Sequence, residues 1–162
     1  GLWAKSKGAS SVKVIGRSEQ KRELVEGMGL DYVDSSKEEL GEYDFVLEAV
    51  GAPSSISEAI SITAPGSTVL LMGNPFGDIQ LRQDVYWRIL RKQLTVKGTW
   101  NSKYDGRNPS DWTEALNAIA SHSIDVLPLI SHRFKQEDLK DGLNLMHEHK
   151  QPYCKVMAIW NE

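Results

Sequence analysis

The sequence predicts an α/β fold built on a doubly wound parallel sheet. Two short apolar runs, residues 45–49 and 68–72, are rich in Val, Leu and Phe and alternate little, which is typical of strands buried on both faces of a parallel sheet. Between them, residues 53–63 carry apolar side chains at helical spacing behind a Pro-Ser start. Strand, helix and strand in this order form a right-handed crossover unit.

Ahead of this central unit, short elements alternate between helix and strand. Residues 2–5 are expected to be the last turns of a helix, which Gly8 ends. A strand is expected at 12–15, followed by a helix that Ser18 caps, and a short strand at 32–33. These elements would supply the other half of the sheet.

Behind the central unit, the pattern continues and ends in a short α-β-α-β tail. The expected elements are a helix at 84–91, a strand at 94–98, a helix that starts at Asn108 and Pro109, a strand at 127–130, a helix at 136–149 and a strand at 154–160. The apolar side chains expected to face a core from the two tail helices are Trp112, Leu116 and Ile119, and then Leu139, Leu143 and Met146.

Length and composition exclude several classes of protein. The 162 residues suffice for one domain with its own core, or for one domain and part of a second. The net charge of −3 comes with mixed charges and no basic stripe, so we expect no nucleic-acid partner. No apolar run is long enough for a bilayer, no signal peptide opens the sequence, and one cysteine, Cys154, excludes a disulfide framework. We therefore expect a soluble, cytoplasmic chain without a membrane partner.

Both strands of the central unit end in a glycine, Gly51 in AVGAP and Gly73 in MGNP. Ligands of open α/β sheets bind beyond the carboxyl ends of the strands, where glycine lets a backbone come close. The alternative is that the two glycines only turn the chain.

The order of these pieces resembles the cofactor-binding half of the zinc-dependent medium-chain alcohol/polyol dehydrogenases. The opening WAKSKGASSVKVIGRSEQKRELVEGMGLD is similar to that family's helix, second strand and next helix, and EAVGAP, VLLMGNP, LTVKGTWNS and PLISHRF follow in its order and spacing. The segments KGTWNS, HRF and YCKVM are most similar to its galactitol-1-phosphate 5-dehydrogenase and sorbitol dehydrogenase branch. The resemblance implies a Rossmann-like NAD(P)-binding domain over residues 1–105 and a return segment of the catalytic domain over 106–162.

Two parts of the family pattern are absent from the sequence: the first strand with its G-x-G-x-x-G turn, and the catalytic half with its zinc ligands. We therefore expect a C-terminal fragment that lacks the central first strand and is inactive alone. The gap between the strands at 12–15 and 45–49 would be closed by their direct pairing or by another copy of the chain. The parent enzyme would transfer hydride between a polyol or polyol phosphate and a nicotinamide, with zinc polarising the alcohol.

Two other interpretations stay open. A zinc-free medium-chain reductase shares the same cofactor domain, and its upstream sequence would carry no zinc ligands. A non-catalytic remnant would act only as a nucleotide-binding or oligomerisation module.

The residues after the second strand favour NADP over NAD. Members that prefer NAD carry Asp or Glu at the position of Gly16, whereas this sequence continues with Arg17 and Ser18. Arg17 can form two hydrogen bonds to a phosphate and Ser18 one more, and Lys21 adds a second cation. The alternative is a solvated arginine at a helix start.

The resemblance implies further cofactor contacts along the ends of the later strands. They are Ala49, Val50, Gly51, Met72, Gly73, Asn74, Thr99, Trp100 and Asn101. Trp100 could equally pack at the strand edge. We assign no metal ligand to this sequence, because His147 and His149 are poorly spaced for one ion and no carboxylate or cysteine joins the four histidines. Cys154 is expected to be a small core residue, and we assign no catalytic residue because no Ser/His/Asp or Cys/His arrangement has a motif behind it.

The resemblance implies that the stretch 94–100 is an edge strand that pairs antiparallel with its twin in a homo-oligomer. Its sequence LTVKGTW is apolar and β-branched, and Lys97 is its only protection against pairing.

Overall fold

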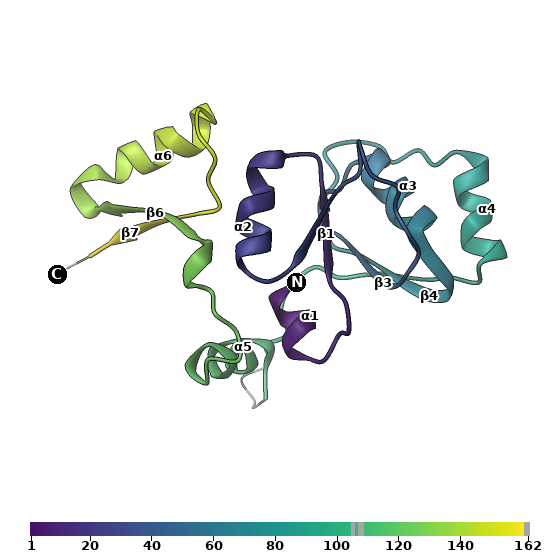
Figure 1. The fold of residues 1–162 in the computed structure, drawn as a ribbon, viewed down its shortest axis with the longest axis horizontal. Coiled ribbons are helices and arrows are strands. Elements are labelled where there is room, and N and C mark those ends of the chain that lie inside the picture. Colours follow the sequence, from purple (N-terminus) through teal and green to yellow (C-terminus); the bar gives the residue numbers. More distant parts are fainter. Residues whose placement is uncertain (105, 107–108, 161–162) are drawn as a thin grey trace. The chain divides into compact units, whose positions relative to one another are not determined.

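A computed structural model describes residues 1–104, 106 and 109–160. The chain forms two compact units, one of residues 1–38 with 104–162 and one of residues 39–103. The predicted α/β class is confirmed, since every strand pair of the described residues is parallel and helices alternate with the strands (Figure 1). The expected division into a cofactor-binding domain of residues 1–105 and a return segment of residues 106–162 stays a prediction. Residue 105 lies outside the described residues.

The unit of residues 39–103 is built on a three-stranded parallel sheet of order β3-β4-β5. Its two helices enclose a core around Ile56, Ile60 and Val85, and Leu71 of the middle strand packs against that core. Val69 on this strand is fully buried. The elements are β3 (Tyr43–Glu48), α3 (Pro53–Ile62), β4 (Thr63–Leu71), α4 (Gln83–Arg91) and β5 (Thr95–Gly98).

The prediction that β3 is buried on both faces is wrong. Val46 and Glu48 are buried, whereas the side chains between them, Phe45 and Leu47, are 58% and 47% exposed. The reason is that α3 and α4 both contribute to the core on the Leu71 side of the sheet, and successive side chains of a strand point to opposite faces. Within this unit one face of the sheet is therefore covered.

The first part of the other unit pairs β1 with β2 in a parallel two-stranded sheet. Its core contains Val25, Leu30 and Tyr32, against which Leu2 and Val14 pack. The elements are α1 (Leu2–Ser6), β1 (Lys13–Gly16), the 3-10 turn η1 (Glu19–Lys21), α2 (Arg22–Gly27) and β2 (Asp31–Asp34).

The predicted cap at Ser18 is wrong in its detail. A 3-10 turn follows Ser18, the α-helix begins only at Arg22, and the Ser18 side chain forms no capping hydrogen bond. The Ser18 backbone is instead held by Tyr32, whose hydroxyl accepts a hydrogen bond from the Ser18 N–H and donates one to the Ser18 carbonyl.

The α-β-α-β order of the tail is confirmed, and its last two strands pair in parallel. The expected strand at 127–130 is wrong, because Pro128 lies in a 3-10 turn and the strand starts at Ile130. The expected cap Asn108 lies outside the described residues, and Ser110 caps the helix by accepting from the Thr113 N–H. The elements are α5 (Asp111–Ala120), η2 (Leu127–Leu129), β6 (Ile130–Lys135), η3 (Gln136–Asp138), α6 (Leu139–Glu148) and β7 (Lys155–Ile159).

The expectation that the apolar faces of α5 and α6 are buried is largely wrong. Ala118 and Gly142 are the buried residues of these helices. Helical spacing of apolar residues identifies a face, but it does not say whether another element covers that face. The apolar side chains that are exposed are Trp112, Leu116, Ile119, Leu139 and Leu143.

Among the residues that the structure describes, the helices are too short or too polar to cross a membrane.

Candidate functional site

Glu48, the last residue of β3, forms the centre of the candidate site in the unit of residues 39–103. Its Oε1 accepts hydrogen bonds from the backbone N–H of Val50 and of Gly51, both at 2.8 Å, and from the Ser55 hydroxyl at 2.7 Å. Its main-chain carbonyl accepts from the N–H of Met72 and of Gly73, at 2.9 and 3.1 Å. One residue therefore joins the turns that follow β3 and β4.

Gly51 and Gly73 bring these two turns into direct contact. A Cβ on Gly73 would overlap the Gly51 amide nitrogen and would lie 2.6 Å from the carbonyl carbon of Val50. A Cβ on Gly51 would lie 2.6 Å from the Asn74 carbonyl, and Gly51 also has a positive φ of 82°. The alternative that these glycines only turn the chain is insufficient, because the close approach of two backbones requires both of them.

Glu48 is only 4% exposed, and its second carboxylate oxygen, Oε2, has no hydrogen-bond partner among the described residues. Burial raises the pKa of this carboxyl, but the amide of Gly51, the hydroxyl of Ser55 and the amide of Val50 lower it further, so the pKa lies below the usual range of a glutamate. The sequence contained a signal for this residue, a glutamate inside the apolar run FVLEAV, and our sequence reasoning missed it.

The structure brings six of the sequence-predicted residues together at this edge: Ala49, Val50, Gly51, Met72, Gly73 and Asn74. Thr99 adjoins them, because its N–H donates to the Leu71 carbonyl at 2.9 Å and extends the pairing of β4 with β5. Trp100 is 72% exposed, and Asn101 is exposed as well. This edge therefore exposes the large side chains of Val50, Met72 and Trp100.

The remaining predicted residues, Arg17, Ser18 and Lys21, lie after β1 in the other unit. Arg17 and Lys21 are exposed, and the side chain of neither forms a hydrogen bond or ion pair with another residue in the part of the chain that the structure describes. Ser18 is half-buried and held by Tyr32. Two cations in this turn are thus available for an anion.

Nearby charges already have partners. Arg22 binds Glu19, Glu38 and Glu26 at 2.6, 3.0 and 3.3 Å. Asp34, which lies opposite Gly16 in the sheet, is buried. The Ser36 hydroxyl and amide and the Lys37 ammonium, 3.1 Å away, lower the pKa of Asp34 to about 2. This carboxylate is therefore ionised, and Lys37 offsets its charge.

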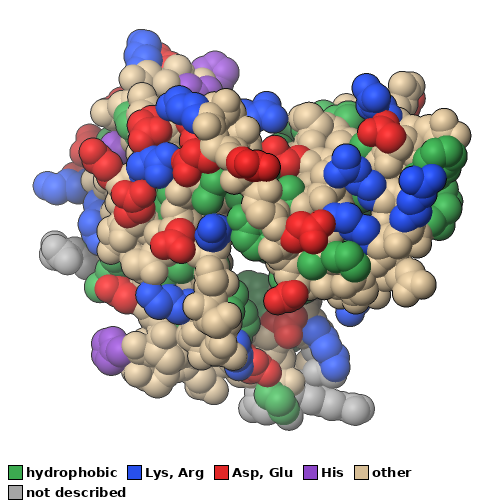
Figure 2. Space-filling model, turned by 45° about the vertical axis from the view of Figure 1, so that its right-hand side comes forward, with side chains coloured by type: hydrophobic (Ala, Val, Ile, Leu, Met, Phe, Trp, Pro, Cys, Tyr) green, Lys and Arg blue, Asp and Glu red, His purple; other side chains and the backbone are tan. Residues whose placement is uncertain are grey.

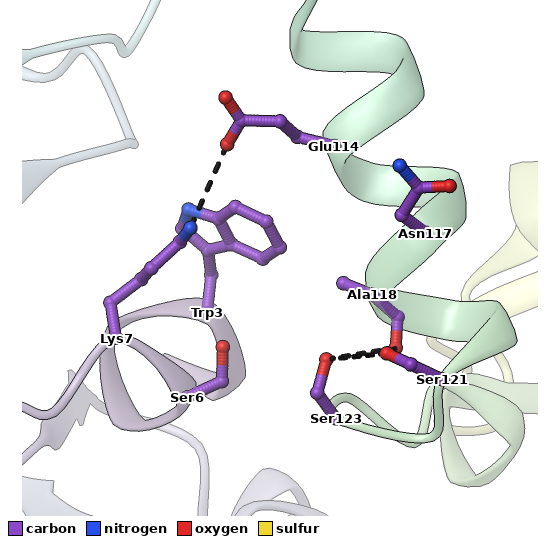
Figure 3. Close-up of a pocket in the computed structure, with 8 residues that line it drawn as sticks. All are labelled: Trp3, Ser6, Lys7, Glu114, Asn117, Ala118, Ser121 and Ser123. Atoms are coloured by element: carbon purple, nitrogen blue, oxygen red, sulfur yellow. Dashed lines mark hydrogen bonds and ion pairs between the residues drawn. The ribbon is translucent and has the colours of Figure 1, made fainter. Parts of the chain in front are cut away.

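A hollow of about 470 Å³ lies between α1 and α5 and contains none of the predicted residues. In Figure 3 the Lys7 ammonium lies near the Trp3 ring, 4.7 Å from its centroid, and 3.7 Å from Glu114 Oε2. The hydroxyls of Ser121 and Ser123 contact each other at 3.3 Å. The residues that line it are Trp3, Ser6, Lys7, Glu114, Asn117, Ala118, Ser121 and Ser123.

No cluster of three or more His, Cys, Asp or Glu side chains suited to a metal ion occurs among residues 1–104, 106 and 109–160. The described residues therefore do not fit a zinc site. Figure 2 shows acidic and basic side chains interspersed on the visible face.

Comparison with known proteins identifies the family of this chain. The family described as "Zinc-binding dehydrogenase" matches residues 1–121. The chain is 28% identical over 163 aligned positions to galactitol 1-phosphate 5-dehydrogenase of Escherichia coli K12, covering 94% of this chain and 47% of that protein. It is 29% identical to L-threonine 3-dehydrogenase of Bacillus subtilis, covering 88% of this chain and 43% of that protein.

Solved structures of such relatives have the same fold as this chain. The crystal structure of galactitol-1-phosphate dehydrogenase from Escherichia coli superposes with a TM-score of 0.86 at 27% identity, over 98% of this chain and 49% of that one. The chain thus spans about half the length of the curated relatives that it matches.

Replacing Gly73 with alanine should destabilise the unit by about 3 kcal/mol, because the new Cβ has no space between Gly51 and Val50. Gly98→Ala is the matched control, since Gly98 lies on the same sheet and its Cβ would meet no heavy atom within 4 Å. Urea unfolding measures both variants. Equal midpoints for the two would contradict the close backbone approach.

Stability should fall with acid partly through Glu48. Because its folded-state pKa is below the ordinary value of about 4.3, ionised Glu48 stabilises the fold above that pH. This contribution is lost as the pH falls through the folded-state pKa. In Glu48→Gln the unfolding free energy should therefore change less between about pH 5 and pH 3 than in the unmutated chain. The exposed Glu23→Gln is the control, and an unchanged slope in Glu48→Gln would refute this role.

Proposed function

Because the chain belongs to the zinc-binding dehydrogenase family, we propose that it binds the nicotinamide dinucleotide of an oxidoreductase and prefers NADP to NAD. One observation carries the preference: Arg17 and Lys21 follow Gly16 as exposed cations without partners among the described residues. A phosphate placed there gains charge-assisted hydrogen bonds without first breaking an ion pair. Gly16 adds no negative charge to repel it.

The edge formed by β3 and β4, in the unit of residues 39–103, is a second candidate cofactor surface. Gly51 and Gly73 let the two turns pack backbone against backbone, and the exposed residues Met72 and Asn74 flank this contact. Glu48 fixes the position of both turns. We assign this edge to the nicotinamide and its ribose, with Thr99, Trp100 and Asn101 beyond it. The bound cofactor supplies the hydride transfer, and these residues hold and orient it.

The substrate proposal rests on the relatives. We infer that the whole protein acts on a polyol or polyol phosphate, as the name of galactitol 1-phosphate 5-dehydrogenase states for that enzyme. We propose that the zinc of the whole protein is bound by the catalytic half of the family pattern, which this sequence does not include. The chain by itself is then expected to bind the cofactor without oxidising polyols.

Replacing Arg17 with alanine should weaken NADP binding about tenfold or more, since a charge-assisted bidentate contact contributes about 1.5–3 kcal/mol. NAD binding should change little. Arg133→Ala, which removes an exposed arginine of β6, should leave both affinities unchanged. Isothermal titration of the two dinucleotides measures this. Equal affinity of the unmutated chain for NAD and NADP would overturn the cofactor assignment.

We also propose that β5 pairs with a second copy of the chain. It forms one edge of the sheet β3-β4-β5, and all four of its residues are exposed. Thr95→Lys places a second charge beside Lys97 and should shift the chain toward monomer in sedimentation velocity, because like charges oppose edge pairing. Asn117→Lys on the exposed surface of α5 is the control. A monomeric unmutated chain would contradict this proposal.

A further inference from the structure

Tyr32 lies directly behind the turn that we assign to the 2′-phosphate. It is the second residue of β2, pairs with Val14 of β1 and is only 5% exposed. Its hydroxyl accepts from the Ser18 N–H and donates to the Ser18 carbonyl, both at 2.9 Å. The buried ring therefore reaches past the end of β1 and fixes the backbone on the far side of Arg17.

The same hydroxyl fills the space that a side chain at position 16 would need. A Cβ on Gly16 would lie 2.6 Å from Tyr32 Oη, 3.1 Å from Cζ and 3.2 Å from Cε2. Real Cβ atoms essentially never come within 3.0 Å of another heavy atom, so a side chain at position 16 would have to displace the Tyr32 hydroxyl. An aspartate or glutamate at position 16 cannot enter unless the tyrosine moves.

The tyrosine is not free to move. The Arg22 guanidinium lies over its ring, 4.9 Å from the centroid, and donates to the Tyr32 carbonyl at 3.2 Å. Arg22 is itself held by the carboxylates of Glu19, Glu26 and Glu38. Displacing the ring would disturb this ion-pair network and the core cluster that includes Val25.

We propose that Tyr32 is a positioning residue that determines cofactor specificity. It excludes an acidic side chain at position 16, and it holds Ser18 so that the Arg17 turn is preformed for a 2′-phosphate. This inference rests on the proposed function of residues 16–18, and it adds a residue that does not itself touch the ligand. Preference for NADP then depends on the strand behind the turn as well as on the cations within it.

The steric half of the proposal is tested without any cofactor. Gly16→Ala should lower the melting temperature in the unmutated background, and it should cost measurably less in Tyr32→Phe, which removes the atom 2.6 Å away. Circular dichroism melts of the two single variants and the double variant form the cycle. A cost for Gly16→Ala that is the same in both backgrounds would overturn the steric role.

The positioning half is tested by titrating Tyr32→Phe with NADP and NAD. Loss of the two hydrogen bonds to Ser18 should lower the ratio of NADP to NAD affinity about fivefold, with NAD binding little changed. Tyr86→Phe, on the 53%-exposed tyrosine of α4, should leave the ratio unchanged. An unaltered ratio in Tyr32→Phe overturns the positioning role while the proposed function stands. An unmutated chain without NADP preference overturns the proposed function, and the specificity role with it, whatever the melts show.

Discussion

The buried carboxylate of Glu48 is the interaction on which the architecture of residues 39–103 depends. Three donors converge on one of its oxygens, and its backbone carbonyl receives two more N–H groups from the turn after β4. An apolar residue at this position would leave the buried Gly51 N–H without its acceptor, at a cost of about 1–3 kcal/mol. The contact between the Gly51 and Gly73 turns follows from this arrangement, and with it the shape of the sheet edge.

The unit that contains β1 and β2 uses the same physical device. There, too, a buried polar side chain, Tyr32, binds the backbone just beyond a strand end, and a glycine, Gly16, provides the space. In both units the side chain that organises the turn is buried, and the turn also carries exposed residues, Val50 and Asn74 in one unit and Arg17 in the other. This is the arrangement expected when ligands bind to backbone and to loop residues at the carboxyl ends of parallel strands.

The local sequence pattern predicted most of the helices and strands. It did not predict which of their side chains are buried or which groups they contact. The apolar runs at 45–49 and 68–72 and the Pro53 start identified β3, α3 and β4, because these signals depend on nearest neighbours in the sequence. The exposure of Phe45 and Leu47 could not be predicted, since it depends on which elements cover the sheet. Glu48 and Tyr32 were missed for a related reason. The apolar run FVLEAV marks Glu48 as unusual, but the roles of both residues also depend on backbone far away in the sequence or in the neighbouring strand, which no local pattern reveals.

The account depends on one claim above all, that the turn after β1 receives a 2′-phosphate. Amide NMR spectra of the chain, titrated with adenosine 2′,5′-bisphosphate and in parallel with adenosine 5′-monophosphate, test it most directly. The account predicts that the amide signals of residues 16–21 shift with the bisphosphate and respond little to the monophosphate. Equal responses to the two nucleotides, or a response to the bisphosphate that leaves residues 16–21 unchanged, would contradict it.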